Sequence, residues 1–279
     1  MRKNSLKIKF IVSLAALSLV SFQSCKQRDD WPVFDVTPKM PDDQIVVVDN
    51  DKTWYVETLE SKGNTFFKTF IRDSISTLGA GITYASIQFI DGLDQVQLIH
   101  IVEADLNNPN VGVVSMTPFG EQFPNLQVLS AMAKDNDGKG GKIIAAINGD
   151  NWAASTTNAY GNPSNGFVNF GKVMKGWVNS TTNITRPYLA VKKSGEVFIG
   201  NTQNNTTSPF VWIEQTEFEH QVSGPTWVNY AAWLNTANTD LIVRSFVGIN
   251  EAENKLYFVV NEGKRPGTAI GIGAPNMAR

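Results

Sequence analysis

The sequence predicts an α+β fold, a β-rich mixed-sheet domain with few short helices. Three observations predict it. Most apolar segments are short, many are separated by turns rich in Gly, Asn, Asp and Ser, and helical spacing of apolar residues is confined to brief stretches. With 279 residues, of which 42% are hydrophobic, the chain is long enough to bury one large core or two small ones.

The first 24 residues have the composition of a lipoprotein signal peptide. A basic head, Arg2–Lys9, precedes the apolar run Phe10–Val20, which is too short to span a bilayer stably. A small residue, Ser24, then precedes Cys25, the one cysteine of the chain. We expect residues 1–24 to be removed and Cys25 to be lipidated. An ordinary signal peptide followed by an incidental cysteine is the alternative.

The segment after Cys25 predicts where the protein works. Residues 25–45 are polar, charged and Pro-containing, as is typical of a tether. We expect a protein of the cell envelope, anchored to the outer membrane through its lipid and exposed at the surface. The four basic residues of the signal leave with it, so the mature chain carries 20 basic and 26 acidic residues. This balance argues against a nucleic-acid partner, which a basic face would have to bind.

The elements expected along the chain are mostly strands. Strand-like patterns begin at Ile45–Val48 and Trp54–Val56, and apolar spacing favours a helix over Thr65–Ser76. Two β-prone runs, Ile82–Ile90 and Gln95–Glu103, flank the turn signal Asp91–Asp94. The other expected elements are a strand at Val111–Met116, a helix at Leu126–Ala133 capped by Asn125, a strand buried on both faces at Lys142–Ile147, and strands at Gly166–Val173, Tyr188–Val191, Glu196–Ile199, Leu241–Ile249 and Lys255–Val260.

The first candidate site follows the apolar run Lys142–Ile147. Asn148, Gly149 and Asp150 come directly after it, and a buried strand would deliver them to a fixed place. The glycine would let the backbone turn tightly between two polar side chains. An ordinary turn between strands is the alternative explanation of the same residues.

Two further candidates are charged residues, one within an apolar strand and one at the end of another. Arg244 lies in an apolar strand, where a guanidinium needs either a carboxylate from a neighbouring strand or a ligand anion such as phosphate. Glu262 ends the apolar strand Lys255–Val260 and could equally belong to a charged turn. His100 is expected to be a strand histidine. The sequence predicts no cofactor and no metal, because no His/Cys cluster exists and no loop has the ligand spacing of a calcium site.

Several motifs, in this order, resemble the phosphodiester glycosidase family, which includes the enzyme that uncovers mannose 6-phosphate. They cover about Gly81 to Gly263. The matching motifs are Asp105-Leu106-Asn107-Asn108-Pro109, Ser130-Ala131-Met132-Ala133, Ile144-Ala145-Ala146-Ile147-Asn148-Gly149-Asp150, Gly161-Asn162-Pro163, Gly171-Lys172, Val222-Ser223-Gly224-Pro225 and Arg244-Ser245-Phe246-Val247-Gly248, with Glu262-Gly263-Lys264 where Asp-Gly-Arg is usual.

The resemblance implies hydrolysis of a sugar-1-phosphodiester in a glycan or glycoconjugate. Arg244 would hold the phosphate, Asp150 and Glu262 would supply acid/base chemistry, and Asn148 with Gly149 would orient the substrate. It also implies a glycosidase-like domain over 81–279, preceded by an N-terminal extension over 46–80.

Relative to the family, we expect the domain to be incomplete at its C-terminus, because the family's Asp-Gly-Gly-Gly-Ser turn would follow Arg279. The activity of this chain is therefore left open. The alternative function is a non-catalytic, surface glycan-binding lipoprotein, which the tether and the seven tryptophans favour.

Overall fold

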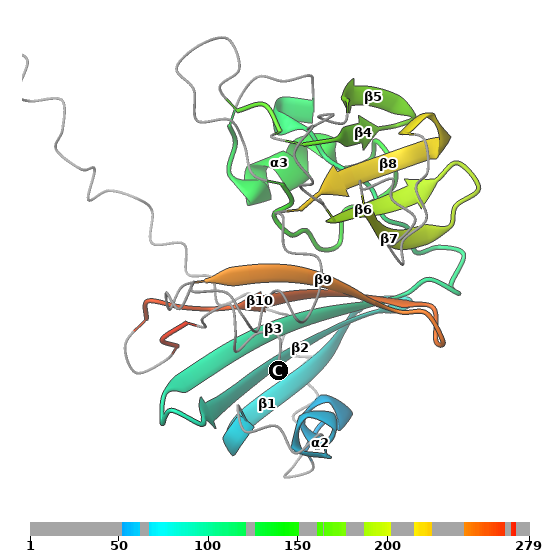
Figure 1. Ribbon diagram of the computed structural model, residues 1–279. Coiled ribbons are helices and arrows are strands. Elements are labelled where there is room, and N and C mark those ends of the chain that lie inside the picture. The colour runs from blue at the N-terminus through cyan, green and yellow to red at the C-terminus, as the bar shows by residue number, and fades with distance from the viewer. Residues whose placement is uncertain are drawn as a thin grey trace, which may run out of the picture. The chain divides into compact units, whose positions relative to one another are not determined.

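The computed structural model describes residues 52–61, 67–120, 126–150, 161–163, 165–176, 187–201, 215–224, 243–265 and 269–271. All of them belong to one compact unit spanning Asp43–Arg279. Two antiparallel five-stranded sheets and a few short helices make up the described part, so the predicted α+β, β-rich class is confirmed (Figure 1). Among the described residues, none of the helices has the length and apolar composition that a membrane span needs.

The strand order of the first sheet is β1-β2-β3-β10-β9, and that of the second is β5-β4-β8-β6-β7. The elements in chain order are α2 (Trp54–Ser61), β1 (Phe67–Gly79), β2 (Ile82–Asp91), β3 (Val96–Asp105), the 3₁₀ helix η1 (Pro118–Gly120), α3 (Leu129–Asn136), β4 (Phe167–Asn169), β5 (Lys172–Lys175), β6 (Pro187–Lys192), β7 (Val197–Asn201), the 3₁₀ helix η2 (Gln215–Glu217), β8 (Phe218–Ser223), β9 (Arg244–Asn250) and β10 (Lys255–Asn261).

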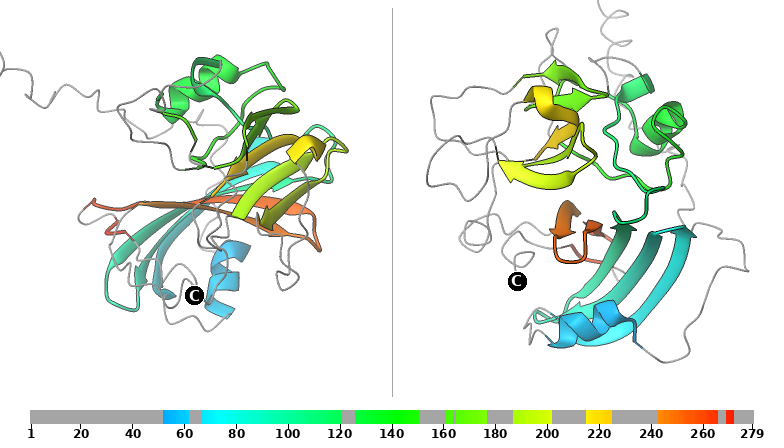
Figure 2. Two further views of the ribbon diagram at one scale, coloured as in Figure 1. Left: turned by 45° about the horizontal axis from the view of Figure 1, so that its top comes forward. Right: turned by 90° about the vertical axis from the view of Figure 1, so that its right-hand side faces the viewer.

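One face of the first sheet packs against helix α2 (Figure 2). Tyr55 and Val56 of the helix are buried, and Leu59 packs beside them at helical spacing. Alternate residues of β2 complete the core, because side chains two apart on a strand point to the same face. These core residues are Ala85, Ile87 and Phe89, with Phe67 from β1 and Ile99 and Ile101 from β3.

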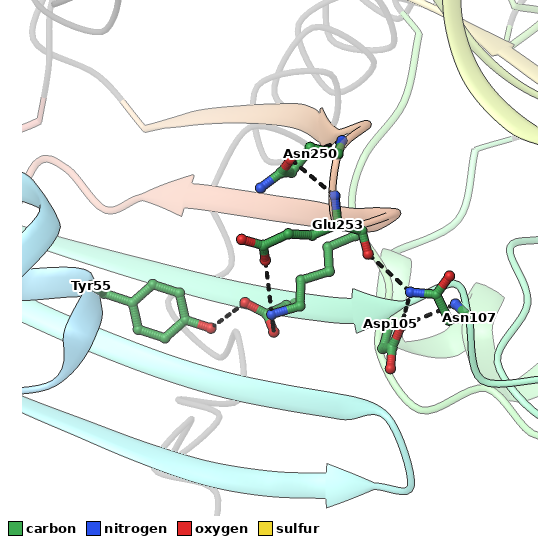
Figure 3. A network of polar contacts seen from close by, with 8 residues as sticks. Tyr55, Asp105, Asn107, Asn250 and Glu253 are labelled. Atoms are coloured by element: carbon green, nitrogen blue, oxygen red, sulfur yellow. Dashed lines mark hydrogen bonds and ion pairs between the residues drawn. The ribbon is translucent and has the colours of Figure 1, made fainter.

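A polar network fastens α2 to the same face of the sheet (Figure 3). The Tyr55 hydroxyl donates to the Glu103 carboxylate at 2.9 Å, and Lys255 pairs with the other oxygen of that carboxylate at 3.1 Å. Lys255 also pairs with Glu253 at 3.2 Å. Burial and the nearby Glu103 charge raise the pKa of Tyr55, so its hydroxyl stays a donor. The network therefore links helix, β3 and β10 by charge-assisted hydrogen bonds.

Two expectations near the N-terminal end of the described part were wrong. Trp54–Val56 was expected to be a strand and begins α2. Thr65–Ser76 was expected to be a helix, but its described residues, 67–76, lie in β1. The register of β1 shifts near Thr69 and again near Ile71, which breaks the two-residue alternation. Phe67, Phe70 and Ile75 consequently reach one core at spacings of three and five residues, which mimics a helical pattern.

The strands with clear turn signals were predicted correctly. β2 and β3 occupy the expected runs, and Asp94 takes the left-handed conformation (φ 60°) in the turn between them. The Asp91 carboxylate accepts the amides of Leu93 and Gln95 at 2.9 Å each, which fixes that turn. The predicted hairpin formed by β6 and β7, and the strands β9 and β10, are also confirmed. β1 and α2 precede residue 81 and are integral to the first sheet and its core.

Two expected strands are absent from the described residues. Val111–Met116 and Lys142–Ile147 form neither helix nor strand, and Ile143–Ile147 are half-buried where full burial was expected. At the start of the second run, the Ile143 amide donates to the Asp137 carboxylate at 2.7 Å. A loop side chain thus takes the amide that a strand partner would have bonded.

Helix α3 was predicted three residues too early. It begins at Leu129 after Val128, which provides no side-chain cap, and the expected cap Asn125 lies outside the described residues. The second sheet has its own small core of Val168, Tyr188, Ala190 and Phe218.

Candidate functional site

The strongest cluster of polar side chains on the first sheet centres on His100. Its Nε2 lies 2.8 Å from Oε1 of Glu262, and its Nδ1 lies 2.7 Å from the hydroxyl of Tyr84. The other oxygen of Glu262 accepts a hydrogen bond from Arg265. These four residues come from β2, β3 and the segment after β10, and the directly bonded His100 and Glu262 are 162 residues apart in the sequence.

Strand alternation explains why these side chains meet. His100 pairs with Ser86 of β2 on one side and with Val260 of β10 on the other. Cross-strand partners share a face of the sheet, and so do residues two apart on one strand. Tyr84 and Glu262 therefore lie on the face of His100. Ile99 and Ile101, the neighbours of His100 in β3, point to the opposite face and pack in the core beneath α2.

The protonation state of the cluster follows from Glu262. Burial acts to raise the pKa of this carboxyl, but the hydrogen bonds and charges of His100 and Arg265 outweigh it and lower the pKa. Glu262 is therefore ionised at neutral pH and accepts the Nε2 proton of His100. The other ring nitrogen of His100, Nδ1, forms its hydrogen bond with the Tyr84 hydroxyl.

Tyr84 remains protonated within this arrangement. Burial raises the pKa of its hydroxyl, the hydrogen bond with Ser86 lowers it, and the Glu262 charge raises it further. The cluster is still open to solvent, because the side chains of His100 and Glu262 are 28% and 22% exposed. It can therefore exchange protons with a bound molecule or with water.

Arg244 opens β9 beside the end of β10. Its side chain is half-buried. In the register of β9 and β10, Arg244 lies opposite Asn261, which is almost fully buried. The side-chain amide of Asn261 donates to the backbone carbonyl of Glu262 at 2.7 Å and lies 3.3 Å from the side-chain oxygen of Gln97. Pleating places Arg244 and Asn261 on one face of the sheet and the Glu262 carboxylate on the other. Arg244 and Glu262 thus share one margin of the sheet, on opposite faces.

A buried amide network supports this margin. Gln97 is fully buried, and its Nε2 donates both to the Asp91 carboxylate and to the Gly271 carbonyl at 2.9 Å. Such satisfied buried bonds hold backbone segments in one arrangement. The end of β10, which carries Asn261 and precedes Glu262, is therefore positioned by groups from β2, β3 and the C-terminal segment.

The other predicted residues belong with the second sheet. The carboxylate of Asp150 accepts the backbone amide and the side-chain amide of Asn165, each at 2.7 Å. Gly149 approaches Val222 of β8 so closely that an added Cβ would lie 2.3 Å from a valine methyl carbon. This glycine is required for close approach, and its φ is not in the left-handed region. Asn148 is exposed.

The structure thus brings Glu262 and Arg244 to one margin of the first sheet and anchors Asp150 beside Asn165. That Arg244 and Asp150 converge on one substrate stays a prediction. Cys25 lies outside the described residues. Sequence reasoning placed His100 in a strand but did not single out Tyr84. The alternation Tyr84, Ser86, Gln88 of polar residues along β2 was the available signal.

A second histidine cluster is structural. The Ser115 hydroxyl donates to the Val168 carbonyl at 2.7 Å, so its single proton is already used. It can only accept from His220 Nδ1 and from Asn169, each at 3.1 Å. Ser115 and His220 are both buried and cannot act as nucleophile and base in this arrangement.

Among the described residues, no group of three His, Cys, Asp or Glu side chains is arranged to hold a metal ion. Comparison of the whole chain with models of protein families and with curated proteins gives no match.

Proposed function

We propose that the protein is an exported lipoprotein that hydrolyses a sugar-1-phosphodiester in a glycan or glycoconjugate. The ordered motifs that resemble the phosphodiester glycosidase family support this proposal. The observation that carries it is that the ionised Glu262 carboxylate and Arg244 lie at one margin of the first sheet, on its two faces. A phosphodiester needs a cation to bind it, and its hydrolysis at the sugar needs a carboxylate or another base.

The protonation state of Glu262 selects the chemistry. A carboxylate with a lowered pKa cannot serve as a general acid near neutral pH. The leaving group of this reaction is a phosphate monoester, whose second pKa is about 6, so it departs without taking up a proton. Water must instead lose a proton as its oxygen bonds to the anomeric carbon. The ionised Glu262 carboxylate therefore fits the role of a base rather than an acid.

The other predicted residues have defined parts in the proposal. Arg244 binds the phosphate bidentately, and its partner Asn261 keeps it at the sheet margin. Asp150 is the second carboxyl group, oriented by its two hydrogen bonds to Asn165. Asn148 and Gly149 orient the sugar. The lipid on Cys25 holds the protein at the outer membrane, where glycans are within reach.

A nitrophenyl ester of a sugar 1-phosphate tests the bond that breaks. Cleavage at the anomeric carbon releases nitrophenyl phosphate, which becomes coloured only after added phosphatase removes the phosphate. Direct colour without phosphatase would mean P–O cleavage and would contradict the proposal. We expect Arg244→Ala to lower kcat/KM by about 10²- to 10³-fold. Arg72→Ala, in the other edge strand, is the matched control and should keep the rate of the unaltered chain. Equal rates in the two variants would reject the role of Arg244.

The alternative is a glycan-binding lipoprotein without catalysis. Trp54 favours it, because this large aromatic ring is 45% exposed on α2, where a sugar ring can stack. Neutral glycans should then quench tryptophan fluorescence, and Trp54→Ala should reduce the quenching. Binding that requires a phosphate group would contradict this alternative.

A further inference from the structure

We propose that the side-chain oxygen of Asn261 accepts a hydrogen bond from the sugar hydroxyl beside the phosphate that Arg244 binds. The inference rests on the phosphate-binding role of Arg244 in the proposed function, and it adds a residue that selects the sugar. In a sugar-1-phosphodiester this hydroxyl is the one on C2, next to the anomeric carbon. A substrate that lacks it should therefore bind less tightly.

Arg244 and Asn261 are neighbours on one face of the first sheet. Arg244 of β9 lies directly opposite Asn261 of β10. Residues paired in this way have Cβ atoms about 4.5–5.5 Å apart. On the other side of Asn261 lies Ile99 of β3, which packs against the core beneath α2. Asn261 is therefore placed between the apolar core and the arginine, close to any molecule that the arginine holds.

The side-chain oxygen of Asn261 is a buried acceptor without a donor. Asn261 is 1% exposed, and among the described residues none donates a hydrogen bond to Oδ1. Its Nδ2, by contrast, has two acceptors, the Glu262 carbonyl at 2.7 Å and Gln97 Oε1 at 3.3 Å. Buried polar atoms in folded proteins are almost always paired with protein, water or ligand, because leaving them unpaired costs free energy. Oδ1 therefore calls for a donor from a bound molecule.

Gln97 fixes which way the Asn261 amide points. Gln97 Nε2 donates to the Asp91 carboxylate and to the Gly271 carbonyl, each at 2.9 Å, and a backbone carbonyl can only accept. Gln97 Oε1 is then the atom that faces Asn261, so Asn261 must present its amino group there. The Glu262 carbonyl requires the same orientation. Exchanging the nitrogen and oxygen of Asn261 would set acceptor against acceptor at both contacts.

This orientation turns Oδ1 away from β3. The oxygen and nitrogen of an amide lie on opposite sides of Cγ, and Nδ2 of Asn261 faces Gln97 of β3. On the other side of β10 lies β9, with Arg244 as the residue opposite Asn261. Arg244 is half-buried on a long side chain. We expect its guanidinium to turn outward as it takes up a phosphate, which would open a path to Oδ1 for a hydroxyl of the same ligand.

The two side chains together define the chemistry of the ligand. The guanidinium of Arg244 supplies donors and suits an oxyanion, whereas Asn261 Oδ1 is an acceptor and suits a hydroxyl. A sugar 1-phosphate carries both groups on adjacent carbon atoms. Hydrogen bonds to the 2-hydroxyl strengthen as the bond at the anomeric carbon breaks. Asn261 should therefore favour catalysis as well as binding.

Calorimetric titration with glucose 1-phosphate and 2-deoxyglucose 1-phosphate, each as both anomers, tests this contact without turnover. We expect the unaltered chain to bind the form with the 2-hydroxyl about tenfold more tightly. Asn261→Leu, which removes the acceptor at similar volume, should bind the two ligands alike, and Arg244→Ala should lose both. Asn250→Leu, the same substitution at the far end of β9, is the matched control and should keep the tenfold preference.

A purely structural role of Asn261 would give a different pattern. Loss of the network at the end of β10 would weaken both ligands equally, so a preference that persists in Asn261→Leu would overturn the inference. A measurement on the unaltered chain needs no variant: the ¹³C signal of the Asn261 side-chain carbonyl should shift with glucose 1-phosphate and not with the 2-deoxy form. The same shift with both ligands, or none with either, would also overturn it.

The inference and the proposed function fail in different ways. Equal binding of the two ligands by the unaltered chain would overturn the contact with Asn261 and leave the role of Arg244 standing. Absence of binding of either ligand would overturn the phosphate-binding role and the inference with it. The expected preference without any cleavage of a sugar phosphodiester would support the contact and reject the hydrolysis.

Discussion

The contact between Gly149 and Val222 makes a sharp test of the structure. A Cβ added at Gly149 would lie 2.3 Å from Val222 Cγ1 and 3.6 Å from Val222 Cβ. Carbon atoms in contact prefer separations of about 3.5–4.0 Å, so the methyl group would have to move by more than about 1 Å. Valine is stiff at χ1 and cannot simply rotate away. Overpacking of this kind costs about 1–3 kcal/mol, and we expect Gly149→Ala to destabilise the fold by about 2 kcal/mol.

The second substitution, Val222→Ala, relieves the clash. It removes the methyl carbon at 2.3 Å and leaves the valine Cβ position at 3.6 Å, an ordinary contact. Alone it should cost about 1 kcal/mol, because Val222 is half-buried. In the double variant the overpacking disappears. The double variant should therefore be about 1–2 kcal/mol more stable than the sum of the two single effects would make it.

The free energy of unfolding of the unaltered chain, the two single variants and the double variant is measured by urea unfolding, followed by circular dichroism. The midpoints are compared at a common m-value. Gly248→Ala in β9 is the matched control, because nothing lies within 4 Å of a Cβ added there. It should change the free energy of unfolding by less than about 1 kcal/mol. Additive costs in the Gly149→Ala/Val222→Ala cycle would refute the close approach of these two segments.

Four further outcomes are expected. Burial lowers the pKa of His220, with the Glu219 charge opposing it, so the unfolded chain takes up this proton first on acidification. The contribution of buried, neutral His220 to the free energy of unfolding should be fully present above about pH 6.5 and be lost as the pH falls below it. In thermal melts, the difference in Tm between pH 7.5 and pH 5 should therefore be smaller for His220→Gln than for the unaltered chain. Glu103→Ala should cost about 2–3 kcal/mol in urea unfolding, because it removes the acceptor of the Tyr55 hydroxyl and one of the two carboxylates that pair with Lys255, whereas Glu103→Gln should cost less; equal costs would contradict the network. Phe119 is half-exposed at φ 57°, so Phe119→Asn should raise stability by about 1 kcal/mol, and a loss would show that the ring packs favourably. Cys25→Ser should move the protein from the membrane to the soluble fraction after cell lysis, and an unchanged distribution would contradict lipidation.

The predictable part of this fold was its local hairpins. The turn from Asp91 to Asp94 and the turn between β6 and β7 are specified by residues within a few positions of each other. The errors arose where packing overrides local pattern. Residues 54–56 are β-prone in composition, yet they form a helix because Tyr55, Val56 and Leu59 then reach one core.

Only part of the candidate site was identified from the sequence, and its arrangement was not. Glu262 and Asp150 were identified from their positions after apolar runs and Arg244 from its position within one, whereas Tyr84 and His100 were not identified as site residues. The pairing of β3 with β10 sets which of them meet, and this pairing joins segments about 160 residues apart. A shift of that register by one residue would turn Glu262 to the α2 face of the sheet, away from His100, whose own face is fixed by its pairing with Ser86 of β2. No local pattern in β3 specifies the register of a strand so distant in sequence.

The insertion of β10 beside β3 has a consequence for synthesis of the chain. β3 ends at Asp105, whereas its partner hairpin begins only at Arg244, roughly 140 residues later. At about 5–20 residues per second, the ribosome needs about 7–30 s to make that interval. Throughout it, the backbone groups along one side of β3 have no native strand to bond. A nascent chain arrested before Arg244 should therefore recruit holdase chaperones, and one released after Asn261 should not.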